Sequence, residues 1–183
     1  MTSKIIELFK NAGLINSEND QIVLLGVRRI CGALMDLFIA TVWSLVLGDI
    51  FVGILFEICY SVLRIYAGGY HASSVRMCKR LTYTSTLISI LIVFMVDING
   101  ILVHCLVALF ICLIGFNAPV ENVNKPLNKI EKKVYKRNCI VISSVEIGLY
   151  IFFEIMEFAI YARTVCMAIV LVAIGVIIEK RKQ

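Results

Sequence analysis

The chain has 183 residues, of which 60% are hydrophobic and 17% are charged, and its formal net charge is +5. Its mean hydropathy is +0.92, and its charged fraction falls below the roughly 25% that is usual in soluble domains. This composition excludes a disordered chain and argues strongly against an ordinary soluble domain, so we expect a protein whose solvent is a lipid bilayer.

Residues 1–29 carry charge throughout and contain no long apolar run, so we expect a cytoplasmic or interfacial segment rather than a secretory signal. Apolar and charged residues alternate in an amphipathic pattern over residues 4–14, and residues 17–20 offer N-cap side chains for a helix over 21–29. Two interpretations are open. The segment is either an interfacial helix that meets a membrane-bound partner, or an anchor that only orients the first span.

Six apolar stretches follow, each close to the ~17–25 residues that a helix needs to cross the hydrocarbon. We expect spans over residues 30–47, 50–66, 81–98, 101–116, 139–156 and 158–178. Short turns around Gly48, Asn99 and Glu157 favour antiparallel hairpins. The predicted fold is therefore an all-α polytopic membrane protein with six transmembrane helices. We expect a single domain over residues 1–183, with the bundle at 30–178 and a cytoplasmic tail at 179–183.

The basic residues gather on one side of this arrangement. Of the 18 Lys and Arg residues, all except Arg163 lie before the first span, around the connections between spans two and three or four and five, or after span six. Cytoplasmic loops retain Lys and Arg during insertion. We therefore expect both termini and the two larger loops to be cytoplasmic.

Residues 64–78 differ from the apolar sequence around them. They place His71 seven residues before Cys78, at the cytoplasmic end of the second span. Seven residues of straight helix rise about 10.5 Å, whereas a base and a nucleophile need to lie ~3 Å apart. The backbone must therefore bend if the two residues cooperate, and Gly68 and Gly69 provide a break before His71.

Two interpretations of His71 and Cys78 follow from the residues alone. Cysteine attacks as the thiolate, which positive charge stabilises, and Arg76, Lys79 and Arg80 adjoin Cys78 in sequence. His71 could then take the thiol proton and later deliver it to a leaving amine, as in Cys–His peptidases. Alternatively, Cys78 is a buried structural cysteine and His71 is satisfied by backbone carbonyls.

Two acidic residues inside the expected spans are candidates for supporting roles, because ionisable groups in a membrane usually face the bundle interior. Glu57 and Arg64 are seven residues apart and share one helical face, so Glu57 could hold Arg64 in position. Asp36 lies at a comparable depth on the preceding span and could orient His71 or Arg64. Either acid could instead be a hydrogen-bonded packing residue.

The loop over residues 117–138 is rich in lysine. It could attract an acidic substrate segment to the inner face through Lys125, Lys129, Lys132 and Lys133. Membrane topology and attraction to anionic lipid explain the same charges, so we expect no nucleic-acid partner. Metal catalysis is disfavoured because the chain has no His-Glu-x-x-His motif, and we expect no cofactor.

Two sets of residues resemble the accessory gene regulator B (AgrB) family. They are Arg64, Ala67-Gly68-Gly69-Tyr70-His71-Ala72 and Cys78, and then Ala118-Pro119 and Asn124-Lys125-Pro126-Leu127 with the lysines that follow. The resemblance implies a polytopic membrane cysteine peptidase of Gram-positive bacteria that processes a quorum-sensing propeptide. The family's nucleophile maps onto Cys78 and its catalytic histidine onto His71, and its required Arg and Gly map onto Arg64 and Gly69.

The same resemblance implies a reaction and a location. The Cys78 thiolate would attack an AgrD-like propeptide, release its C-terminal tail and form a thioester, which an internal Cys or Ser would convert into a thiolactone or lactone. The site would lie at the cytoplasmic face of a bacterial cell membrane. Membrane lipid is the other expected partner, and the N-terminal segment is a candidate homodimer contact. The rival interpretation is a non-enzymatic transporter or scaffold, in which the Gly-Gly break and the intramembrane acids line a solute path.

Overall fold

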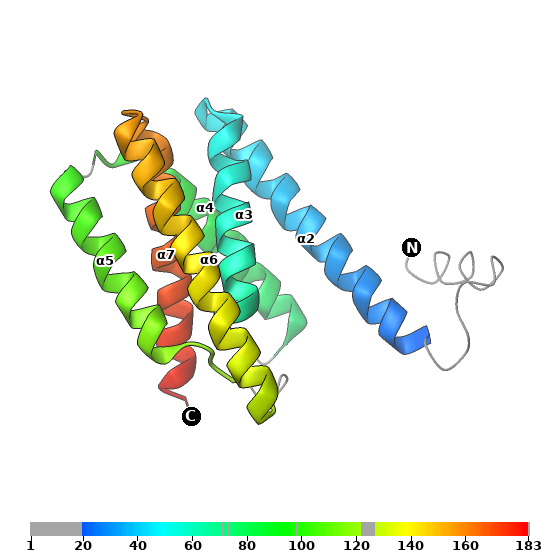
Figure 1. The fold of residues 1–183 in the computed structure, drawn as a ribbon. Coiled ribbons are helices and arrows are strands. Elements are labelled where there is room, and N and C mark those ends of the chain that lie inside the picture. The colour runs from blue at the N-terminus through cyan, green and yellow to red at the C-terminus, as the bar shows by residue number, and fades with distance from the viewer. Residues whose placement is uncertain (1–19, 71, 73, 98, 122–126, 183) are drawn as a thin grey trace. The chain divides into compact units, whose positions relative to one another are not determined.

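The computed structural model describes residues 20–70, 72, 74–97, 99–121 and 127–182. These residues form only α-helices and connections. The helices are α2 (Asp20–Leu47), α3 (Ile50–Ala67), α4 (Val75–Met95), α5 (Gly100–Asn117), α6 (Lys129–Ile155) and α7 (Ala159–Lys180) (Figure 1). All 6 are long and apolar enough to cross a membrane. The predicted fold class, an all-α protein with six membrane spans, is confirmed.

Three helices begin well before the apolar stretches that predicted them. α2 starts at Asp20, so the helix expected over residues 21–29 is continuous with the first span, while the amphipathic pattern at residues 4–14 lies outside the described residues. The Ser74 hydroxyl caps α4 by accepting from the Met77 N–H, and Asn128 caps α6 in a reciprocal capping box with Glu131. Hydropathy alone missed these starts because the first turns carry basic and polar residues.

The chain forms two compact units, Met1–Phe38 and Ile39–Gln183. The described part of the first unit is the N-terminal part of α2. In the second unit, the end of α2 packs closely on α3. The Gly53 N–H donates to the Ser44 hydroxyl at 3.0 Å, and a Cβ on Gly53 would lie 2.3 Å from the Ala40 carbonyl oxygen. Glycine therefore permits this close helix contact.

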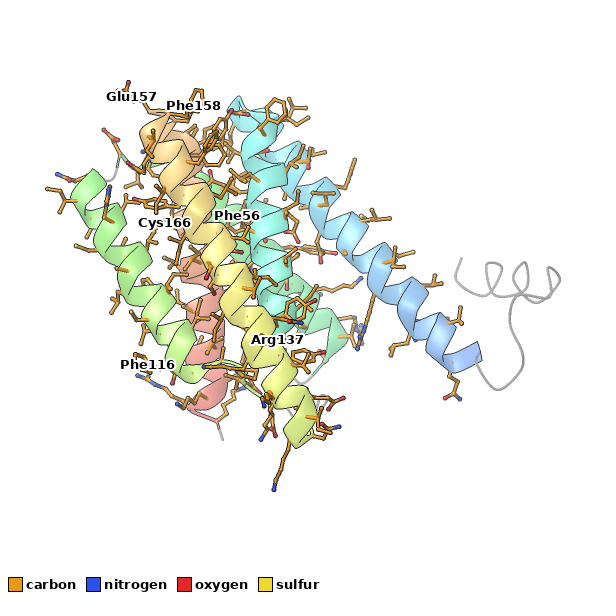
Figure 2. The ribbon with its side chains drawn as sticks, in the orientation of Figure 1. Phe56, Phe116, Arg137, Glu157, Phe158 and Cys166 are labelled. Carbon is orange, nitrogen blue, oxygen red and sulfur yellow. The ribbon has the colours of Figure 1, made fainter. Side chains whose placement is uncertain are left out.

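Helix α7 is the centre of the second unit, where it packs against α3, α4, α5 and α6 (Figure 1). Many of its buried side chains are small, including Ala162, Ala168 and Ala173. Small residues let helices approach closely in a membrane. Figure 2 shows Cys166 of α7 and Phe56 of α3 in the middle of this unit, and both side chains are buried. α7 can therefore pack closely against several helices at once.

The two ends of this unit differ in charge, and Figure 2 marks one with Glu157 and Phe158 and the other with Phe116 and Arg137. At the first end, the Tyr161 hydroxyl donates to the Asp49 carboxylate at 2.9 Å, and Arg163 pairs with Asp97. We call the other end the basic end; it comprises the C-termini of α3, α5 and α7 and the N-termini of α4 and α6. There, Lys136 donates to the Ala118 carbonyl at 2.8 Å, and Lys180 donates to the Asn117 side chain at 2.5 Å. Lysines thus satisfy polar groups at the end of α5.

Candidate active site

The break expected after the second span is present at the end of α3. The last helical residue is Ala67, and the Gly68 N–H donates to the Arg64 carbonyl at 3.0 Å. Gly68 has φ 79° and Gly69 has φ 147°. Glycine adopts these backbone angles readily, whereas other residues are strained there. The chain therefore leaves the helix at Gly68, and the next helix, α4, begins at Val75.

A close contact with the connection that follows α5 also requires glycine at position 68. The Val120 N–H donates to the Ala67 carbonyl at 3.0 Å, and a Cβ on Gly68 would lie only 2.5 Å from the Val120 carbonyl oxygen. Ala118 and Val120 are both buried. The segment around Ala118 thus packs on the segment around Gly68, although the two are far apart in sequence.

Gly69 lies against the backbone of α7. A Cβ on Gly69 would lie 3.6 Å from the Gly175 carbonyl carbon, and a Cβ on Gly175 would lie 3.7 Å from the Tyr70 nitrogen. Gly175 therefore leaves room for the backbone of Gly69 and Tyr70 beside α7.

Arg64 connects the last turn of α3 to the backbone at Tyr70. Its guanidinium donates to the Tyr60 hydroxyl and, at 3.1 Å, to the Tyr70 backbone carbonyl. The guanidinium also lies 5.3 Å from the centre of the Tyr60 ring, within the range of a cation–π interaction. These contacts fix the backbone directly before His71, which itself lies outside the described residues.

Cys78 lies in the first turns of α4 and is partly buried. Its backbone N–H donates to the Ser74 carbonyl at 2.9 Å. Together with Arg64, Gly68 and Gly69, Cys78 lines a cavity of about 530 Å³ between α3, α4 and α7. This volume lies in the range of about 300–1,000 Å³ that is usual for small-ligand sites. Four of the predicted site residues therefore meet in one cavity.

The cavity also contains residues that the sequence did not single out. Lys182 lines it, with its ammonium 4.0 Å from the centre of the Tyr70 ring, and so do Tyr60 and Gly175. Tyr60 precedes Arg64 by one helical turn, and this spacing was a usable signal. The sequence contains no such signal for Gly175 and Lys182. Their place in the cavity depends on a contact between α7 and a segment about a hundred residues earlier.

The remaining candidates lie in other places. Glu57 is buried on α3 and accepts a hydrogen bond from the Ser61 hydroxyl; its support of Arg64 stays a prediction. Asp36 belongs to the first unit, so its role also stays a prediction. At the start of α6, Lys132 forms an ion pair with Glu121, and both Lys129 and Lys133 are exposed. Lys125 lies outside the described residues.

A family model described as AgrB, accessory gene regulator B, matches residues 2–177 of the chain. The matched range covers nearly the whole chain and includes both the Gly-Gly break and Cys78. No curated protein and no solved structure is significantly similar to the chain.

Proposed function

Because the chain belongs to the accessory gene regulator B family, we propose that it is a membrane cysteine endopeptidase that processes an AgrD-like propeptide. Family membership supports a role in the quorum-sensing autoinducer pathway, and the 6 candidate spans make the chain a multi-pass membrane protein. The observation that carries the proposal is that Cys78 lines a cavity together with Arg64 and Gly69. The cavity lies at the basic end, which by the positive-inside rule would face the cytoplasm.

In the first step, the Cys78 sulfur attacks the carbonyl carbon at the cleavage site. His71 takes the thiol proton and passes it to the nitrogen of the leaving peptide, so that the C–N bond breaks and the tail departs with a new amino terminus. The rest of the propeptide stays attached to Cys78 as a thioester.

In the second step, an internal Cys or Ser of the propeptide attacks the thioester carbonyl. The nucleophile's proton passes through His71 to the sulfur of Cys78, and the product is a thiolactone or a lactone. Exchange of one thioester for another is nearly balanced in energy, so ring closure competes with hydrolysis only where water is excluded. The cavity is suited to this requirement, because aliphatic side chains line it, one from α4 and the others from α7: Leu81, Leu171, Val172, Ile174 and Ile178.

Arg64 acts in this scheme as a positioning residue. It joins Tyr60 on α3 to the Tyr70 carbonyl, which belongs to the peptide unit directly before His71. A fixed backbone at this point would hold the imidazole near Cys78, and precise placement of reacting groups is a large part of catalysis.

The lysines at the start of α6 are the proposed binding site for an acidic tail. Lys129 and Lys133 are exposed at the basic end, and Lys132 is already paired with Glu121. Positive charge there would raise the local concentration of an acidic segment. We include Lys125 on the basis of its sequence position. Attraction to anionic lipid is the competing explanation for the same charges.

The test is to co-express the chain with its propeptide and to detect the released tail and the cyclic product by mass spectrometry. Wild type is compared with Cys78→Ala and His71→Ala, and Cys139→Ala is the control because Cys139 is buried on α6 and does not line the cavity. We expect both site variants to release no tail and the control to release it normally. Normal processing by Cys78→Ala would refute the peptidase and favour a transporter or a scaffold.

A further inference from the structure

The C-terminal end of α5 is capped by a lysine from another helix. The last turn of α5 has no basic residue of its own, and the last carbonyls of a helix have no partner inside it. Lys136 of α6 donates to the Gly115 carbonyl in this turn and, at 2.8 Å, to the carbonyl of the C-cap residue Ala118. Ala118 is buried, and a buried carbonyl without a hydrogen bond is costly.

Lys136 differs from the exposed lysines on the same helix. An ammonium has three N–H donors, and that of Lys136 directs bonds to two carbonyls of the α5 terminus. Its side chain is partly buried, whereas Lys129 and Lys133 are exposed. Lys136 therefore differs in its contacts from the lysines that are proposed to attract an acidic tail.

The chain that Lys136 holds also contacts the end of α3. We define the connecting segment as residues 118–121. Its Val120 N–H donates to the carbonyl of Ala67, the last residue of α3, at 3.0 Å. The Val120 carbonyl oxygen approaches Gly68 so closely that a Cβ there would lie 2.5 Å away. The connecting segment therefore lies between Lys136 and the break that follows α3.

The connecting segment is short and is held at both ends. Lys136 bonds to Ala118 at its start, and Lys132 forms an ion pair with Glu121 at its end. Pro119 follows Ala118, and the proline ring fixes its own φ angle. A displacement at the start of the segment is therefore passed on to the residue that bonds to α3.

We propose that Lys136 is a positioning residue of the candidate active site. By holding the connecting segment against the end of α3, it fixes the break at Gly68 and Gly69, which line the cavity together with Cys78. Arg64 holds the backbone after the break, and Lys136, acting from α6, holds the backbone before it. This inference rests on the proposed function and adds to it a residue that acts on the site through other residues.

The first experiment separates catalysis from substrate binding. Tail release gives kcat and KM for wild type, Lys136→Met, Lys136→Arg and the control Arg137→Met, which replaces an exposed residue of the same helix. Methionine lacks the donors of lysine, whereas arginine keeps both charge and donors. We expect Lys136→Met to lower kcat by about tenfold or more and to keep KM within about twofold, because misplaced catalytic groups slow the chemical step.

The other variants and a second substrate decide between the two roles of a lysine. Lys136→Arg should regain most of the wild-type kcat, and Arg137→Met should keep both constants. The loss in Lys136→Met should be the same for a propeptide with a neutral tail. If kcat is unchanged, or if only KM rises and only for an acidic tail, the inference is overturned.

The second experiment needs no turnover. Amide hydrogen exchange is measured on the full chain in detergent for wild type, Lys136→Met and Arg137→Met. We expect Lys136→Met to speed exchange by about two- to tenfold in peptides from residues 118–121 and 64–70, since the loss of one hydrogen bond has an effect of that size. Peptides from residues 44–53, at the opposite end of α3, should keep the wild-type rate, and so should all peptides of the control.

The pattern of exchange distinguishes positioning from a general effect on the fold. Faster exchange at residues 118–121 alone, or an equal increase in all three regions, would overturn the inference. Cys78-dependent tail release can still stand in either case. Tail release by Cys78→Ala would instead refute the proposed function.

Discussion

The guanidinium of Arg64 donates a hydrogen bond to the backbone carbonyl of Tyr70 at 3.1 Å and so bridges the break in the chain at Gly68 and Gly69. On its other side, the same group bonds to the Tyr60 hydroxyl on the preceding turn of α3. A planar guanidinium can donate in two directions at once, whereas a lysine ammonium is a point charge on a flexible stem. The bridge therefore depends on the shape of arginine as well as on its charge.

Replacing Arg64 by Lys should lower tail release by about 10- to 100-fold, because misplacing a catalytic group by about 1 Å has an effect of that size. We expect kcat to fall more than KM rises, and the amount of protein in the membrane fraction to stay unchanged. Arg163→Lys, at the opposite end of the second unit, is the matched control. If Arg64→Lys and wild type release the tail at equal rates, the hydrogen bonds of Arg64 to Tyr60 and Tyr70 have no part in the mechanism.

Replacing Gly68 by Ala should destabilise the protein and abolish processing. The new Cβ would meet the Val120 carbonyl oxygen at 2.5 Å, and the backbone has φ 79°. Backbone strain of this kind costs about 1–3 kcal/mol, and the steric contact adds to it. Thermal unfolding in detergent would measure the loss. Gly148→Ala is the control, because nothing lies within 4 Å of its Cβ position. If both variants unfold at the same temperature, the close contact with Val120 does not contribute to stability.

Substitutions of Gly175 should be graded by size. An Ala Cβ would lie 3.7 Å from the Tyr70 nitrogen and 3.8 Å from the Gly69 Cα, which are ordinary contact distances. We therefore expect Gly175→Ala to keep most of its activity and Gly175→Leu to lose about tenfold or more, because the larger side chain would displace the segment that leads to His71. The assay is tail release, with Gly148→Leu for comparison. Equal activity of the two Gly175 variants would contradict the packing of this segment on α7.

Replacing both Lys129 and Lys133 by Gln should raise KM for a propeptide with an acidic tail by several-fold at low salt, with little change in kcat. The effect should fade as salt is added, because exposed charges are screened over about 10 Å at 0.1 M ionic strength. A propeptide with a neutral tail serves as the control substrate. If the variant loses affinity equally for both propeptides, the lysines act on the membrane or on the fold and not on the tail.

Much of the fold followed from hydropathy and charge. Apolar runs located all 6 spans, because a helix must cover the hydrocarbon thickness with apolar side chains. The starts of α4 and α6 were placed too late, because Ser74 and Asn128 cap these helices outside the apolar runs. Capping is a local signal, and Asn128 with Glu131 could have been read from the sequence.

The candidate site was predicted only where its residues are close in sequence. Arg64, Gly68, Gly69 and Cys78 belong to one short segment, and the structure brings them into one cavity. Their neighbours Val120, Gly175 and Lys182 come from distant segments. Periodicity gives the face of a helix but not the helix that it meets, so these contacts could not be derived from one sequence.

Helix α7 is synthesised after the other described helices, and it supplies five of the 15 residues that line the cavity beside Cys78. While the nascent chain holds only α2 to α6, the cavity lacks the apolar side chains of α7, and Gly69 has no helix to lie on. The proposed active site is therefore complete only after α7 has docked among the helices that precede it.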